Sequence, residues 1–118
     1  MLVVHPAEAL FHPPHDQRST SVHQLTNTSD DKWLAIKVKT SDNSAYRVSP
    51  VYAMVGPKAS ETIRIVRLPT VGKNAVQGTS ALAIEAMEME SKDQDPMEVI
   101  FDHPVCLCQK VGIILRVL

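Results

Sequence analysis

Hydrophobic and polar residues alternate with a period of two along most of this chain, a pattern typical of half-buried β-strands. In WLAIKVK, residues 33–39, the side chains of Leu34, Ile36 and Val38 would share one face. The pattern predicts strands at Leu2–Val4, Ser21–Leu25, Trp33–Lys39, Tyr46–Ser49, Val51–Val55, Thr62–Leu68, Ala81–Met89 and Gly112–Val117. Turn-forming segments such as TNTSDD and GPKAS separate them. Many short strands at near-regular spacing favour an all-β fold, an antiparallel sandwich.

Two segments need interpretation before that assignment is complete. SALAIEAMEMESK is made of strong helix formers, but its apolar residues alternate in two sets, the second out of phase with the first. We interpret it as a strand that changes face near Ala86, at a bulge. Pro50 falls between two strand-like stretches, where it would break a ladder, so we expect the chain to pass from one sheet to the other there.

Length and composition limit the possible classes of protein. The 118 residues suffice for one domain, which we place at 1–118, and 44% hydrophobic with 21% charged residues is an ordinary globular balance. A formal net charge of −1 predicts no binding to nucleic acid. Because no apolar run approaches about 20 residues, we expect no insertion into a membrane. Cys106 and Cys108 lie too close together in the sequence for a disulfide between them to stabilise the fold. The absence of such a disulfide favours a location in the reducing cytoplasm.

The net charge conceals an uneven distribution. Nine basic and four acidic residues lie between Arg18 and Lys73, whereas seven acidic residues and one basic residue lie between Glu85 and Asp102. Such blocks are usually solvated faces. A molecule with one basic and one acidic region could nevertheless attract copies of itself.

Candidate catalytic and metal-binding groups form no convincing set. His12, His15 and Asp16 in one segment, and His103, Cys106 and Cys108 in another, have zinc-ligand chemistry but match no standard zinc spacing. We therefore expect no metal and no cofactor. The carboxylates Glu85, Glu88 and Glu90 are better interpreted as the exposed acidic edge of a late strand than as an acid–base pair. We expect no enzymatic activity.

The stretch LTNTSDDKWLAIKVKTSDNSAYRVSPVYAMV resembles the central part of a major sperm protein (MSP) domain. The similarity rests on the Asn-containing loop at Leu25–Asn27, the Lys-x-Lys-Thr-Ser segment at Lys37–Ser41 and the Tyr-x-Val-x-Pro strand at Tyr46–Pro50. Pro6 before Phe11 and the IRIVRLP strand also fit. The resemblance is closest to small nematode sperm-specific proteins, and it implies a seven-stranded immunoglobulin-like β-sandwich without catalytic activity.

The resemblance also suggests binding residues. Relatives that bind acidic peptides carrying two phenylalanines use the segment that corresponds to Lys37, Lys39, Thr40 and Ser41. Other positions of that site differ here, because Ser49 stands where arginine is usual and the segment VQGTSALAI carries neither the expected lysine nor the nearby methionine. From the residues alone, Lys37 and Lys39 would project from one face about 7 Å apart, suited to successive carboxylates of an extended partner. The alternative is a solvated strand whose lysines protect an edge.

Two functions stay open at this point. The first is a structural protein of the sperm cytoplasm and cytoskeleton that associates with itself as a homo-oligomer or with other MSP-domain proteins. The second is an adaptor that binds acidic phenylalanine-containing peptides through Lys37–Ser41. Both make the partner a protein.

Overall fold

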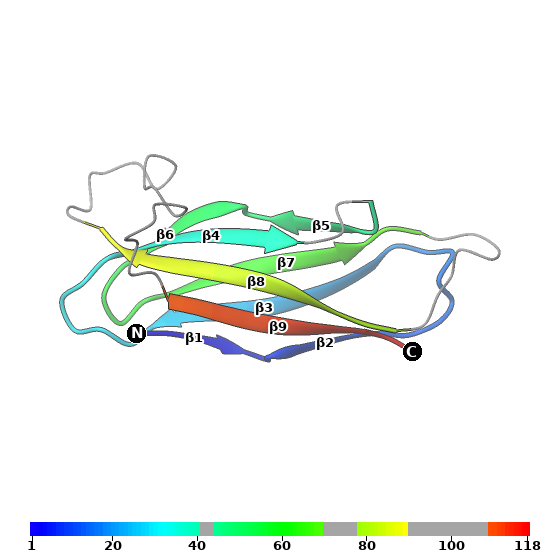
Figure 1. Cartoon of the computed structure of the whole chain (residues 1–118), viewed down its shortest axis with the longest axis horizontal. Coiled ribbons are helices and arrows are strands. Elements are labelled where there is room, and N and C mark those ends of the chain that lie inside the picture. The colour runs from blue at the N-terminus through cyan, green and yellow to red at the C-terminus, as the bar shows by residue number, and fades with distance from the viewer. Residues whose placement is uncertain (41–43, 70–77, 90–108) are drawn as a thin grey trace.

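The computed structural model describes residues 1–40, 44–69, 78–89 and 109–118, and these residues form two β-sheets packed face to face (Figure 1). The strands are β1 (Leu2–His5), β2 (Glu8–Phe11), β3 (Ser19–Asn27), β4 (Leu34–Thr40), β5 (Tyr46–Ser49), β6 (Tyr52–Val55), β7 (Ser60–Arg67), β8 (Gly78–Glu88) and β9 (Gln109–Val117). One sheet has the order β1-β3-β7-β5 and the other the order β2-β9-β8-β4-β6. In the described part of the chain, no helix is long and apolar enough to cross a membrane.

Each of the two outer strands of the sandwich is divided between the two sheets, one as β1 and β2 and the other as β5 and β6. Between β1 and β2 the chain crosses from the four-stranded to the five-stranded sheet at Pro6, and between β5 and β6 it makes the same crossing at Pro50. The peptide bonds before both prolines are cis. Counting each divided strand once, the nine described segments form the seven strands of an immunoglobulin-like sandwich. The fold class and the sheet switch at Pro50 are therefore confirmed; β2, which pairs with β9 in parallel, was not predicted.

The core lies between the sheets and is built from the alternate apolar positions of the strands. Fully buried side chains come from both layers, among them Phe11, Leu25, Ile36, Ile63, Ile65, Leu82, Ile84, Ile113 and Leu115. Burial of so many aliphatic side chains, each stabilising by about 1.5–3 kcal/mol, is the main favourable contribution to folding.

The expected change of face near Ala86 is wrong. The register of β8 with β4 runs without interruption from Leu82 to Glu88, so Ala86 stays in the core with the preceding even-numbered positions. Met87 and Met89 instead belong to a second, smaller apolar cluster with Trp33 and Ala35. This end of the strand has apolar neighbours on both faces, and that produced the out-of-phase pattern.

Side chains from other segments hold the first outer strand in place. The Gln109 side-chain amide donates to the Leu2 carbonyl at 3.0 Å and accepts from the Leu2 N–H at 2.9 Å, so it satisfies edge groups of β1. The buried ring of His23 contacts the Pro6 carbonyl through Nδ1 at 2.6 Å and the Ser21 hydroxyl through Nε2 at 2.8 Å. Because a carbonyl only accepts, Nδ1 is the protonated nitrogen, which donates at the point where the chain changes sheets.

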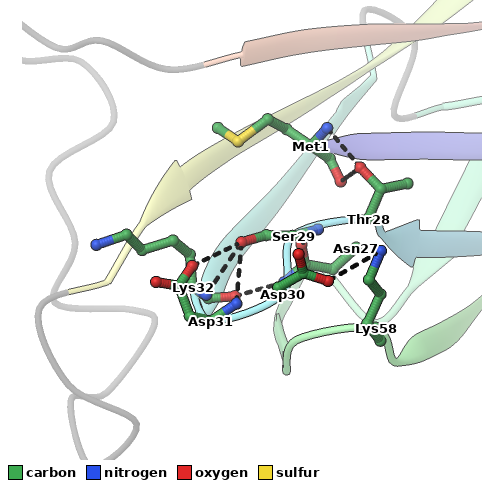
Figure 2. Close-up of polar contacts among 8 residues, drawn as sticks. All are labelled: Met1, Asn27, Thr28, Ser29, Asp30, Asp31, Lys32 and Lys58. Carbon is green, nitrogen blue, oxygen red and sulfur yellow. Dashed lines mark hydrogen bonds and ion pairs between the residues drawn. The ribbon is translucent and has the colours of Figure 1, made fainter.

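The loop after β3 is organised by Asn27, whose side chain is fully buried (Figure 2). Its amide nitrogen donates to the carbonyls of Lys32 at 2.7 Å and Val55 at 3.1 Å. Its amide oxygen accepts from the Ser29 N–H at 3.0 Å. One side chain thus connects its own loop to β6. These bonds need both an amide donor and an amide acceptor, which asparagine provides at this position.

We expect replacement of Asn27 by alanine to lower the free energy of unfolding by about 2–4 kcal/mol, because buried backbone groups would lose their partners. Urea unfolding followed by the fluorescence of Trp33 measures the loss. Thr28→Ala, at the exposed neighbouring position, is the matched control and should cost less than about 1 kcal/mol. Equal effects of the two substitutions would contradict the role assigned to Asn27.

Candidate protein-binding site

Strand β4 displays the predicted lysines on the outer face of the five-stranded sheet. Ile36 and Val38 point into the core, whereas Lys37 and Lys39 are half-buried on the opposite side. Thr40 ends the strand in register with Leu82. Ser41, the last predicted site residue, lies outside the described residues. The alternation therefore places Lys37 and Lys39 on one face.

The two lysines differ in their surroundings. The Lys37 ammonium lies 5.7 Å from the centre of the Tyr52 ring, within range of a cation–π contact. The Lys39 ammonium lies 3.0 Å from Oε1 of Glu85. Lys39 is therefore already engaged with an acidic side chain of its own chain, which the strand pattern could not reveal.

A cavity of about 450 Å³ adjoins these residues. It is lined by Lys37, Val38, Lys39, Thr40, Tyr46, Arg47, Val48 and Val51. The strand pattern predicted the β4 part of this lining but not the part from Tyr46 to Val51. The signal for the missing part was Pro50, since a strand that leaves the sheet there uncovers the end of β4.

The register explains how the cavity opens. Strand β6 pairs with β4 from Leu34 to Lys37, and a further bond joins the Val38 N–H to the Val51 carbonyl at 2.8 Å. Beyond it the chain belongs to β5 in the other sheet, so the end of β4 and the edge of β5 diverge. The Arg47 guanidinium caps part of that edge by donating to the Tyr46 carbonyl at 3.1 Å. The result is an opening with an apolar lining and cationic side chains.

Next to the cavity, the outer face of the five-stranded sheet carries what we call the apolar patch. Its residues are exposed and mostly small: Leu10, Ala81, Ala83, Gly112 and Ile114. The register sets Ala83 opposite Gly112, and Ala81 opposite Ile114. Leu10 and Ile114 are 49% and 41% exposed, which is high for large aliphatic side chains in such a face. Because Ala83 also lies opposite Lys39, the patch begins where the basic side chains end.

The other predicted groups are a carboxylate on this same surface, Glu85, and two sets of candidate zinc ligands. Glu85 was expected on an exposed acidic edge, but it is 5% exposed, because it folds against Lys39. His15 contacts the Leu118 carbonyl, at 2.8 Å, and Arg67. Within residues 1–40, 44–69, 78–89 and 109–118, no three His, Cys, Asp or Glu side chains are grouped so as to hold a metal ion. The candidates His103, Cys106 and Cys108, and most of the acidic block that ends at Asp102, lie outside the described residues.

Comparison with known proteins identifies the family. A family model described as the MSP (Major sperm protein) domain matches residues 1–103. The chain belongs to this family. Among curated proteins it is similar to sperm-specific class P protein 34 of Caenorhabditis elegans, with 39% identity over 77 residues, which are 65% of this chain and 66% of that protein. Sperm-specific class P protein 31 of the same organism is 34% identical over the same shares of the two chains.

Solved structures agree with the MSP fold. WR4, a C. elegans MSP family member, superposes with a TM-score of 0.82 and 29% identity over 100% of this chain and 98% of that chain. The MSP-domain-like protein SSP-19 of C. elegans has a TM-score of 0.77 at 21% identity, over 97% and 96% of the two chains, and shows the fold alone. The curated class P relatives are matched over about two thirds of their length.

The contact between Lys39 and Glu85 generates a stability prediction. Lys39→Met would leave the Glu85 carboxylate buried without its counter-charge and should lower the free energy of unfolding by about 1–2 kcal/mol, less than for a fully buried pair because Lys39 is 37% exposed. The matched control is Lys110→Met, at an exposed position opposite Glu85 on β9, with an expected change within about 0.5 kcal/mol. Chemical unfolding of both variants measures the difference, and equal stabilities would show that the pair is energetically unimportant.

Proposed function

We propose that this MSP-domain protein is a non-enzymatic structural component of the sperm cell, which acts by associating with itself or with other MSP-domain proteins. The names of its curated relatives, sperm-specific class P proteins, support the cell type. A cytoplasmic and cytoskeletal location follows from this role. The proposal assigns the contact to the outer face of the five-stranded sheet.

The observation that carries the proposal is the apolar patch. Small side chains at Ala81, Ala83 and Gly112 leave the backbone of β8 and β9 open to close approach, and Leu10 and Ile114 supply exposed aliphatic surface. An association that relied on exposed charges alone would gain specificity and rate of encounter more than affinity. Burial of the patch would add the apolar contribution to binding affinity that charge complementarity alone does not supply.

Cationic side chains beside the patch favour a partner with acidic groups. Lys39 and Lys110 lie on the same outer face, on β4 and β9. The sequence of this chain carries an excess of acid between Glu85 and Asp102, so a second copy has the complementary charge. A contact between unlike surfaces of two copies can continue as an open chain of molecules.

Ile114→Glu should weaken self-association at least about tenfold, because it places a charge in the patch that the contact would have to bury. Sedimentation analysis over a concentration series measures the dissociation constant. Val22→Glu is the matched control, since Val22 is 46% exposed on the outer face of the other sheet. A protein that is monomeric at all concentrations and does not bind other MSP-domain proteins would contradict the proposal, and equal effects of the two substitutions would place the contact elsewhere.

The cavity supports a second candidate function, the binding of acidic peptides that contain phenylalanine. Val38, Val48 and Val51 provide an apolar lining, and Lys37 and Lys39 border it with positive charge. A volume of about 450 Å³ lies within the range of small-ligand pockets, roughly 300–1,000 Å³, and accommodates an aromatic side chain. In this function, Thr40 and Ser41, which follow the lysines in the sequence, would contribute hydroxyl groups to the binding of the peptide.

Two-dimensional NMR titration of the labelled protein with an acidic, two-phenylalanine peptide tests this candidate. We expect shifts centred on Lys37, Lys39 and Thr40, and we expect the double substitution of both lysines by glutamate to abolish them while the remaining spectrum stays folded. Shifts that persist in the double variant would exclude the site. A dilution series without peptide separates these shifts from those of self-association.

A further inference from the structure

Strand β6 forms one edge of the five-stranded sheet, and β5, the other half of the same divided strand, forms the corresponding edge of the four-stranded sheet (Figure 1). Among the described residues no strand lies beyond either of them. Charged side chains are one of the devices that protect such edges from pairing with other chains. Residues 51–56 carry no charge, and Val51 and Met54 are 47% and 39% exposed. The β6 edge therefore lacks this protection.

The register fixes which backbone groups of β6 face this edge. The Val38 N–H donates to the Val51 carbonyl at 2.8 Å, so these two residues form a hydrogen-bonded pair. In an antiparallel ladder such pairs alternate with pairs whose N–H and C=O groups point away from the neighbouring strand. Ala53 therefore bonds to β4, whereas the N–H and C=O groups of Tyr52 and Met54 point outward. The edge thus offers two donors and two acceptors to an added strand.

The cavity adjoins the same edge. Val51 lines it together with Val38 and Val48. Because Val51 lies opposite Val38, whose side chain points into the core, the Val51 side chain is on the core-facing side of β6. In an added strand, the residue opposite Val51 would direct its side chain to this same side. An apolar side chain at that position would enter the cavity of about 450 Å³ and cover Val51.

A second copy of this chain does not meet this requirement through its own β6. In the antiparallel register that lets both outward residues bond, Tyr52 pairs with Met54 of the copy, and Val51 lies opposite the copy's Val55. Val55 is 1% exposed and belongs to the core of its own molecule, so it cannot enter the cavity. The occupant that fits is an extended segment that is not already part of a sandwich.

The lining of the cavity also limits the charge of that segment. It contains three cationic side chains, those of Lys37, Lys39 and Arg47, and no acidic one. An acidic residue that follows the inserted side chain is therefore favoured over a basic one by charge complementarity. Beside β6 itself, small polar or β-branched residues suit the pairing, because the strand is uncharged.

We propose that β6 accepts a strand from another protein. The added segment pairs antiparallel with Tyr52 and Met54, inserts one apolar side chain into the cavity beside Val51, and carries an acidic residue after it. This contact does not depend on the proposed self-association, which uses the outer face of the sheet. It shares the cavity with the second candidate function, but it adds a main-chain pairing that the second candidate function does not require.

The probe that tests the proposal is the acetylated and amidated peptide Ser-Thr-Val-Thr-Leu-Glu. Its threonines would pair with Met54 and Tyr52, and its leucine would lie opposite Val51. With the full chain at saturating peptide, the amide hydrogens of Tyr52 and Met54 should exchange at least about tenfold more slowly, since they gain acceptors. The amide of Ala53, which already bonds to β4, should change by less than about twofold.

Two control peptides test the side-chain contacts. Calorimetry with the full chain gives their dissociation constants. Replacement of the leucine by serine should weaken binding about tenfold or more, because the apolar side chain no longer fills the cavity. Replacement of the glutamate by lysine should weaken binding about two- to fivefold, and this difference should shrink at high salt.

Met54→Pro tests the main-chain pairing from the side of the protein. It removes an outward N–H without breaking the ladder with β4, a position at which an edge strand tolerates proline. Binding of the leucine peptide should weaken at least about tenfold, whereas the matched variant Met54→Ala, which keeps the N–H, should weaken it less than about threefold. If Met54→Pro is not folded, the exchange of the wild-type amides decides alone.

Each contrary outcome identifies the part that is wrong. Binding of the leucine peptide without slower exchange at Tyr52 and Met54 would overturn the strand pairing and leave the cavity as a binding site. Equal affinities of the leucine and serine peptides would overturn the insertion. Slower exchange at these two amides when the protein is concentrated without peptide would identify a second copy as the occupant. No binding of the leucine peptide would overturn the whole proposal, while self-association and its response to Ile114→Glu would stand independently.

Discussion

The divided outer strands are the constraint on which the rest of this sandwich depends. Each outer strand must close two sheets, and a proline at the crossing allows this, because it donates no backbone hydrogen bond and so interrupts the ladder. At Pro6 the crossing is secured by the buried His23 ring, which donates to the Pro6 carbonyl. At Pro50 the same crossing uncovers the end of β4 and produces the cavity. The opening beside Lys37 and Lys39 is thus a consequence of how the fold closes its edge.

The strands could be located from the sequence wherever one face of a strand is buried and the other is exposed. Alternation located β3, β4 and β7, and Pro50 marked the sheet switch. It missed β2, because Ala9, Leu10 and Phe11 are consecutive apolar residues without alternation, and the partner strand β9 is about a hundred residues away. It misjudged β8 near Ala86, because Met87 and Met89 pack on a second cluster.

The candidate site was predictable only in part, for a related physical reason. A period of two placed Lys37 and Lys39 on one face, since that property depends on β4 alone. The engagement of Lys39 depends on which residue of β8 lies nearby, and this is fixed by a register that no local pattern encodes. For the same reason Glu85 looked like an exposed acid in the sequence, although a lysine on the adjacent strand draws it into the sheet surface.

The apolar patch and the cavity adjoin at Ala83 and Lys39, which lie opposite each other on neighbouring strands. If the patch carries self-association and the cavity carries peptide binding, the two contacts share this border and cannot be made independently. Binding of a peptide would then oppose association of copies through the same face by mass action, and association would lower the apparent affinity for peptide by the same free energy. The Lys39–Glu85 pair lies at this border, where a single side chain can influence both contacts.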